Sequence, residues 1–171
     1  MPRMHGTFRQ NRKANYLSDL MQHIICLGNL WRGDDGFGIH VFRRLNEGCV
    51  LPRHVRVIDG GVAGLQALPC FEGCRKAIVV DALRSAGKVG SVHRLELEDL
   101  CDPEAEFSLH NLGVNHLLKA LPIYLGEAAV PNIVVIGAEV SITLRLTDRL
   151  TPILAASLNE TVERIINECM S

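Results

Sequence analysis

Four short apolar runs, separated by stretches long enough for helices, constrain the fold of this chain most strongly. The runs cover 23–28, 55–59, 76–81 and 132–137. They are largely continuous rather than alternating with polar residues, which is typical of strands buried on both faces. Parallel strands require crossovers of a dozen or more residues, and the intervening stretches are long enough to supply them. The pattern therefore predicts a parallel sheet covered on both faces.

Helical patterns occupy the stretches between these runs. We expect helices over 37–45, 64–71 and 151–169, and a further one marked by Leu112, Val114, Leu117, Leu118 and Leu121. Residues 90–97 alternate polar and apolar, as expected of a half-exposed edge strand that runs antiparallel to its neighbour. The predicted fold is a three-layer α/β/α sandwich with a mostly parallel twisted sheet and one antiparallel edge strand.

The chain length suits one domain with a single core. Residues 1–21 are polar and basic without an apolar period, which predicts a flexible N-terminal arm, and 22–171 form the predicted domain. Lys and Arg total 18 against 19 Asp and Glu, a balance that disfavours nucleic-acid binding. No run approaches the ~20 apolar residues of a membrane span. We expect a cytoplasmic monomer.

The six cysteines form no C-x-x-C pair, and no secretory segment precedes them, so reduced thiols are expected. Cys70 and Cys74 are the alternative metal pair, but they lack a second pair to complete a site. The sequence also contains no G-x-S-x-G elbow, no recognisable Ser/His/Asp set and no cysteine in a nucleophile motif. Conventional protease mechanisms are therefore disfavoured.

Acidic residues follow three of the four buried runs. The first run opens into the glycine-rich segment 28–38 with Asp34 and Asp35, the second ends in Asp59, Gly60 and Gly61, and the third ends in Asp81. Sites in parallel sheets lie beyond the carboxyl ends of the strands. A dinucleotide site is the rival interpretation, but G-x-G-x-x-G is absent and paired carboxylates repel a pyrophosphate.

Asp35, Asp81 and His110 form the predicted site, and all three are expected at the rim of the sheet, outside the core. We expect Asp34 to cap the following helix, which leaves Asp35 to point over the sheet edge. If the first and third strands are neighbours, Asp35 and Asp81 come close enough to require a cation between them. His110, at the start of a helix that Ser108 caps, completes a ligand set suited to zinc or nickel. No role is expected for His5, His23, His40, His54, His93 and the surface residue His116.

The segment 28–38 resembles the motif of the nickel-dependent nickel–iron hydrogenase maturation endopeptidases of the HybD and HycI type. The segment reads Gly-Asn-Leu-Trp-Arg-Gly-Asp-Asp-Gly-Phe-Gly. The resemblance continues in the Asp-Gly-Gly turn at 59–61, in Val-Asp-Ala at 80–82 and in the helix start His110-x-x-Gly113, and it extends over 23–168. The arm before the first strand is longer than the family usually has, and a proline expected near Glu139 is missing.

The resemblance implies an aspartic-type endopeptidase that removes the C-terminal extension of a nickel-loaded hydrogenase large-subunit precursor, the last step of its maturation. Asp35, Asp81 and His110 would be both catalytic residues and metal ligands. The nickel would be carried by the substrate, with zinc or cadmium as substitutes in a crystal. The turn at 59–61 would line the substrate groove, although a tight turn explains its glycines equally well. Client specificity would lie in the loops at 84–107.

Two other functions use the same sequence features. A nickel-checking chaperone would bind the immature large subunit through the same three ligands without cutting it. A nucleotide-binding module on a flavodoxin-like sheet would require phosphate contacts that the acidic first loop disfavours. The appearance of a shortened product separates the protease from the chaperone, and a nucleotide-binding assay tests the third interpretation.

Overall fold

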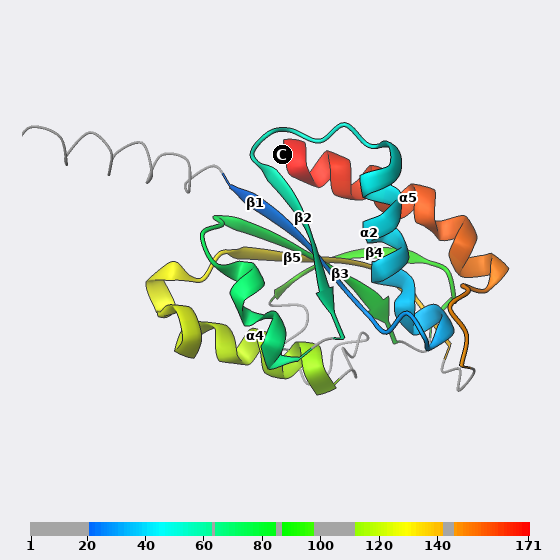
Figure 1. The fold of residues 1–171 in the computed structure, drawn as a ribbon, viewed down its shortest axis with the longest axis horizontal. Helices are drawn as coiled ribbons and strands as arrows, with labels where there is room; N and C mark the ends of the chain where they lie inside the picture. Colours follow the sequence, from blue (N-terminus) through cyan, green and yellow to red (C-terminus); the bar gives the residue numbers. More distant parts are fainter. Residues whose placement is uncertain (1–20, 63, 85–86, 98–111, 142–145) are drawn as a thin grey trace, which may run out of the picture.

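A five-stranded sheet lies at the centre of the protein in the computed structural model, which describes residues 21–62, 64–84, 87–97, 112–141 and 146–171 (Figure 1). The strand order is β2-β1-β3-β5-β4. The first four strands in this order pair in parallel, and β4 runs antiparallel to β5 at the edge. The predicted parallel sheet and its antiparallel edge strand are therefore confirmed. The strands are β1 Gln22–Leu27, β2 Val55–Gly61, β3 Lys76–Leu83, β4 Val92–Glu96 and β5 Asn132–Glu139.

Helices cover both faces of the sheet, which confirms the predicted three-layer sandwich (Figure 1). The α-helices α2, Phe37–Gly48, and α5, Pro152–Met170, pack together on one face. On the other face lie α4, Leu112–Leu125, and the 3₁₀ helix η2, Leu65–Phe71. Two further short 3₁₀ helices are η1, Gly33–Gly36, and η3, Glu127–Ala129.

Alternation along β3 divides the core into two layers. Ile78 and Val80 face the layer that α2 and α5 cover, whereas Ala77 and Val79 face the layer that α4 and η2 cover. Since successive side chains of a strand point to opposite faces, Asp81 shares the face of Val79 and points toward the α4 side. The sheet register thus decides on which side this carboxylate lies.

The segment 64–71 is a 3₁₀ helix rather than the regular α-helix expected from its apolar pattern. Pro69 lies inside it, has no backbone N–H and blocks the hydrogen bond that an α-helix would need there. Short 3₁₀ pieces tolerate this loss better than a continuous α-helix does. The segment still buries Ala67 and Phe71 against the sheet.

A charged network fixes the end of α5 to the sheet. Glu168 accepts a hydrogen bond from Arg94 Nε on β4 at 2.5 Å, and Lys76 Nζ on β3 lies 2.6 Å from its carboxylate. The Glu168 side chain is only 9% exposed. Although burial opposes ionisation, the hydrogen bonds from Arg94 and Lys76 hold the pKa of Glu168 below its ordinary value. The network joins elements that are far apart in sequence, and it lies at the opposite end of the strands from the predicted site.

Within the described part of the chain, no helix is sufficiently long and apolar to cross a bilayer. The predicted arm at 1–21 falls almost wholly outside the described residues.

Candidate functional site

Asp35 and Asp81 lie at the same edge of the sheet because β1 and β3 are neighbours, as the sequence predicted. Asp35 sits in η1, which follows β1 after a five-residue loop, and Asp81 lies within β3. The two carboxylates are close enough for the charge of Asp35 to raise the pKa of Asp81. The edge therefore concentrates negative charge from two different strands.

Asp81 is fully buried, which corrects the expectation that this side chain lies at the rim outside the core. Its Oδ1 accepts a hydrogen bond from Ala82 N at 2.8 Å, while its Oδ2 has no hydrogen-bond partner in the structure as described. Burial raises the pKa of Asp81 to about 7, the Ala82 N–H and Arg84 oppose this rise, and Asp35 adds to it. A buried, unpartnered carboxylate oxygen is costly for a fold and marks a functional group.

Arg84 is a member of the site that the sequence analysis did not identify. Its guanidinium lies 3.7 Å from the Asp35 carboxylate, and its side chain is 29% exposed. The residue follows Asp81 by three positions, just past the end of β3. One sequence signal pointed to Arg84: it is a basic residue at the carboxyl end of the strand that carries Asp81. Arg84 partly balances the charge of the two carboxylates.

The glycine-rich loop allows close packing of α2 against the sheet. A Cβ atom on Gly38 would lie 2.1 Å from the Leu27 carbonyl oxygen and 2.6 Å from that of Val80, so no side chain fits. The start of α2 therefore rests directly on the ends of β1 and β3. Asn29 N donates a hydrogen bond to the Asp35 carbonyl at 3.1 Å and closes the loop on itself. These contacts give the glycines a packing role that requires no phosphate.

Asp34 does not cap its own helix, contrary to expectation. Neither η1 nor α2 has a side-chain hydrogen bond at its N-terminus. The buried Asp34 carboxylate instead accepts hydrogen bonds from Thr151 N at 2.7 Å and Thr151 Oγ1 at 3.0 Å. Thr151 directly precedes α5. Asp34 thus ties the loop that carries Asp35 to the start of the last helix.

The turn at Asp59, Gly60 and Gly61 has a local structural explanation. Asp59 Oδ1 accepts a hydrogen bond from Gly61 N at 2.9 Å, and Gly61 has a φ of +63°. The pairing of β1 with β2 is irregular here, since Cys26 pairs with Asp59 and Leu27 with Gly61. A Cβ atom on Gly60 would lie 2.5 Å from the Leu27 side chain. A tight turn beside a bulge accounts for this sequence, and a substrate role for it stays a prediction.

His110 and its expected cap Ser108 lie outside the described residues, as do Cys101 and half of the segment 84–107. Helix α4 is described from Leu112 onward, and it packs on the face of the sheet toward which Asp81 points. Among the described residues, no three His, Cys, Asp or Glu side chains cluster as metal ligands. The role of His110 as the third ligand therefore stays a prediction.

The other histidines that the sequence analysis left without a role include several with structural contacts. His23 Nδ1 lies 2.8 Å from the Cys70 carbonyl oxygen, and His40 Nε2 lies 3.1 Å from that of Asp148. His116 is exposed, as expected. His93 Nε2 lies 2.6 Å from Oε1 of the buried Glu139.

His93 and Glu139 lie near the carboxyl ends of the parallel strands, as Asp81 does. Gly137 of β5 pairs with Asp81 on one side and with His93 on the other. Asp81 and His93 therefore occupy one row across three strands. The alternating pattern at 90–97 was the signal that could have placed His93 on an inner face.

The described cysteines are free thiols. Burial raises the pKa of the Cys26 and Cys70 thiols, and it raises those of Cys74 and Cys169 to about 11. The thiolate is the nucleophilic form of cysteine, so a raised pKa suppresses reactivity near neutral pH. These four thiols are unsuited to nucleophilic catalysis.

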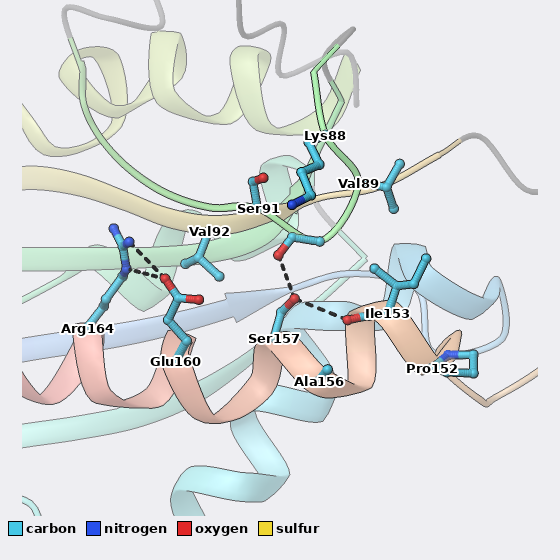
Figure 2. Close-up of a pocket in the computed structure, with 11 residues that line it drawn as sticks. Lys88, Val89, Ser91, Val92, Pro152, Ile153, Ala156, Ser157, Glu160 and Arg164 are labelled. Carbon is cyan, nitrogen blue, oxygen red and sulfur yellow. Dashed lines mark hydrogen bonds and ion pairs between the residues drawn. The ribbon is translucent and has the colours of Figure 1, made fainter.

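A separate open groove of about 730 Å³ runs between the start of β4 and helix α5 (Figure 2). Ser157 Oγ on α5 donates a hydrogen bond to the Gly90 carbonyl at 2.6 Å across its floor, and Arg164 pairs with Glu160 along one wall. The groove lies on the α5 side of the sheet. Asp81 points to the α4 side, so the groove and the carboxylate site are distinct.

Comparisons with known proteins agree on one family. The family model described as hydrogenase maturation protease matches residues 39–168. A Methanocaldococcus jannaschii protein whose name includes the words hydrogenase maturation protease is 37% identical over 57% of this chain and 65% of its own length. This chain therefore spans less than two thirds of that relative. The hydrogenase 2 maturation protease of Escherichia coli is 26% identical over 84% of this chain and 87% of its own.

The fold also matches a solved structure. The hydrogenase maturating endopeptidase HybD of Escherichia coli superimposes with a TM-score of 0.72 at 23% identity, covering 86% of this chain and 91% of that one. At this identity the match supports the fold alone.

Proposed function

The chain belongs to the hydrogenase maturation protease family, and we propose that it is an endopeptidase that removes the C-terminal extension of a nickel-loaded large-subunit precursor of a nickel–iron hydrogenase. The observation that carries the proposal is the buried Asp81 carboxylate, whose Oδ2 has no partner among the described residues and which lies near Asp35 at the carboxyl edge of the sheet. The match to the family motif supports His110 as the third member.

The chemistry of this donor set suits a divalent cation. The two carboxylates repel each other, Arg84 offsets only part of their charge, and Asp81 Oδ2 has no partner among the described residues. Asp35 and Asp81, together with His110, would hold nickel, which we treat as part of the substrate that the precursor carries. Such an ion polarises a scissile carbonyl or lowers the pKa of an attacking water. An imidazole and two carboxylates are ligands that borderline divalent ions accept.

The chain's own residues would control charge and protons at this edge. With a pKa of about 7, Asp81 can hold or release a proton near neutral pH, where a general acid or base is most effective. Arg84 offsets part of the negative charge that Asp35 brings. Asp34 keeps the Asp35 loop anchored to Thr151, so that Asp35 stays in position when substrate arrives.

We further propose that the protein acts as a monomer in the cytoplasm, where folded hydrogenase large subunits would be available before assembly. The turn at Asp59, Gly60 and Gly61 would border the path of the tail. Because Gly28 N donates a hydrogen bond to the Gly61 carbonyl at 2.9 Å, this turn is joined to the end of β1. It therefore lies next to the loop that carries Asp35.

The mass of the large-subunit precursor tests the proposal. The nickel-loaded precursor and a nickel-free control are each incubated with the wild-type chain and with Asp81→Asn. Loss of a C-terminal peptide only from the nickel-loaded precursor, and only with the wild type, is the expected result. An unchanged mass with intact binding would instead support the nickel-checking chaperone.

A further inference from the structure

Trp31, the single tryptophan of the chain, lies on the surface beside the proposed site. It belongs to the loop between β1 and η1 and is 62% exposed, and its neighbour Arg32 is exposed as well. Exposing so large an apolar side chain contributes little to the stability of the fold. Clustered exposed apolar side chains mark sites of interaction, whereas single ones require no explanation. Whether Trp31 marks an interaction site therefore depends on the side chains around it.

Leu146 is a second exposed apolar residue, on a segment that is hydrogen-bonded to the Trp31 loop. Arg32 forms an isolated parallel bridge with Thr147, and Thr147 N donates a hydrogen bond to the Trp31 carbonyl at 3.0 Å. Leu146 directly precedes Thr147, so it belongs to the segment that these contacts join to the Trp31 loop. Leu146 is 85% exposed. We refer to Trp31 and Leu146 as the apolar rim pair.

The loop that presents the rim pair is held by hydrogen bonds. Trp31 N and Arg32 N both donate to Asn29, to its side-chain Oδ1 at 3.1 Å and to its carbonyl at 3.0 Å. Gly33 N donates to the Thr147 carbonyl at 2.8 Å. An ordered loop loses little conformational entropy when a partner binds it. The rim pair is therefore suited to tight docking.

We propose that the rim pair docks an apolar patch on the folded body of the protein substrate, beside the tail that is removed. The inference rests on the proposed function. Trp31 precedes Asp35 by four residues in the same loop, so a body bound to Trp31 brings its tail toward the carboxylates. Tryptophan and arginine are the residues most enriched among those that dominate binding energy. Arg32 adds a preference for an acidic group next to the apolar patch.

Kinetics on the nickel-loaded precursor that the wild-type chain processes test the proposal. Trp31→Ser, Leu146→Ser and the double variant are compared with Val50→Ser, which removes a 94% exposed side chain at the opposite end of the sheet. The double variant should raise KM roughly tenfold or more and change kcat less than about twofold, because the contact is made equally in ground and transition states. Val50→Ser should leave both constants unchanged.

A binding measurement uses the native tryptophan itself. The chain is labelled with fluorotryptophan in an Asp81→Asn background that leaves the precursor intact, so that its fluorine NMR spectrum contains a single signal, from Trp31. Saturating nickel-loaded precursor should shift this signal. A KM unchanged in the double variant, or an unmoved signal, would overturn the docking proposal while wild-type cleavage keeps the proposed function intact. A wild-type chain that releases no tail would instead refute the proposed function and, with it, the docking proposal.

Discussion

Arg84 and Asp35 form an ion pair of 3.7 Å at the carboxyl edge of the sheet, and both act on the buried carboxyl of Asp81. Arg84 lowers the pKa of Asp81, whereas Asp35 raises it. The three side chains come from the ends of β1 and β3. Burial has the largest effect on the pKa of Asp81, and the opposing charges of Arg84 and Asp35 adjust it further, which gives the first prediction.

Replacing Arg84 with Met should shift processing to higher pH. Without the guanidinium, the pKa of Asp81 rises above about 7, and a protonated carboxyl binds a cation poorly. Activity at pH 7 should fall roughly twofold to fivefold, because near its pKa a carboxyl loses much of its ionised form when the pKa rises, and it should recover at higher pH. Arg84→Lys, which keeps the charge, is the matched control. A pH–rate profile identical to that of the wild type would contradict the role given to Arg84.

Asp81→Asn should abolish processing and yet stabilise the fold above neutral pH. A pKa raised in the folded state means that stability is lost as pH rises from about 4 to about 7. The rise from 3.8 to about 7 corresponds to about 4 kcal/mol. The new amide donor lacks a partner, which costs about 1–3 kcal/mol, so a net gain of about 1–3 kcal/mol is expected. Urea unfolding at pH 5 and pH 8 measures it, and an equal difference at both pH values would refute the assignment.

Asp35→Asn and His110→Ala should each abolish nickel-dependent processing while the protein stays folded. Asp35 is partly exposed, so its replacement leaves no buried group without a partner. The mass of the processed precursor and the midpoint of thermal unfolding are the two measurements. Arg53→Gln, an exposed change between α2 and β2, serves as a control for unspecific effects of removing a charge. Variants that unfold would disprove the view that these residues serve chemistry rather than stability.

Asp34→Ala should destabilise the protein by about 2–3 kcal/mol, because Thr151 N and Thr151 Oγ1 lose a charged acceptor. Processing should fall as well, since the loop that carries Asp35 is no longer tied to α5. Thr151→Ser retains both donors and should behave as the wild type. A double-mutant cycle with Thr151→Val should give non-additive losses. Additive losses would mean that the two side chains do not act together.

Glu168→Gln should destabilise the protein by about 1–3 kcal/mol near neutral pH, with partial exposure of Arg94 limiting the loss. The lowered pKa of Glu168 means that its contribution is complete above its ordinary value of 4.5 and is lost as pH falls through the folded-state value. The difference between variant and wild type should therefore shrink below pH 4.5. Denaturant unfolding across this range checks the trend. Processing at neutral pH should stay unchanged while the variant remains folded.

The sequence by itself determined the layers of this protein and the place where Asp35 and Asp81 come together. Continuous apolar runs require strands buried on both faces, and the stretches between them are long enough for crossover helices, so the parallel sheet and its covering followed from pattern alone. The positions of Asp35 and Asp81 near strand ends predicted that the two carboxylates meet at the carboxyl ends of the strands. The motif resemblance identified the family that the comparisons support.

Only the tertiary structure decided how individual side chains are used at that edge. No local rule states that Asp34 binds Thr151 across more than a hundred residues rather than capping its own helix, that Arg84 pairs with Asp35, or that Asp81 is fully buried. Pro69 likewise converted an expected α-helix into a 3₁₀ helix. Periodicity reports which face of an element is apolar, but hydrogen-bond partners and pKa shifts depend on distances between segments that only the packed chain brings together.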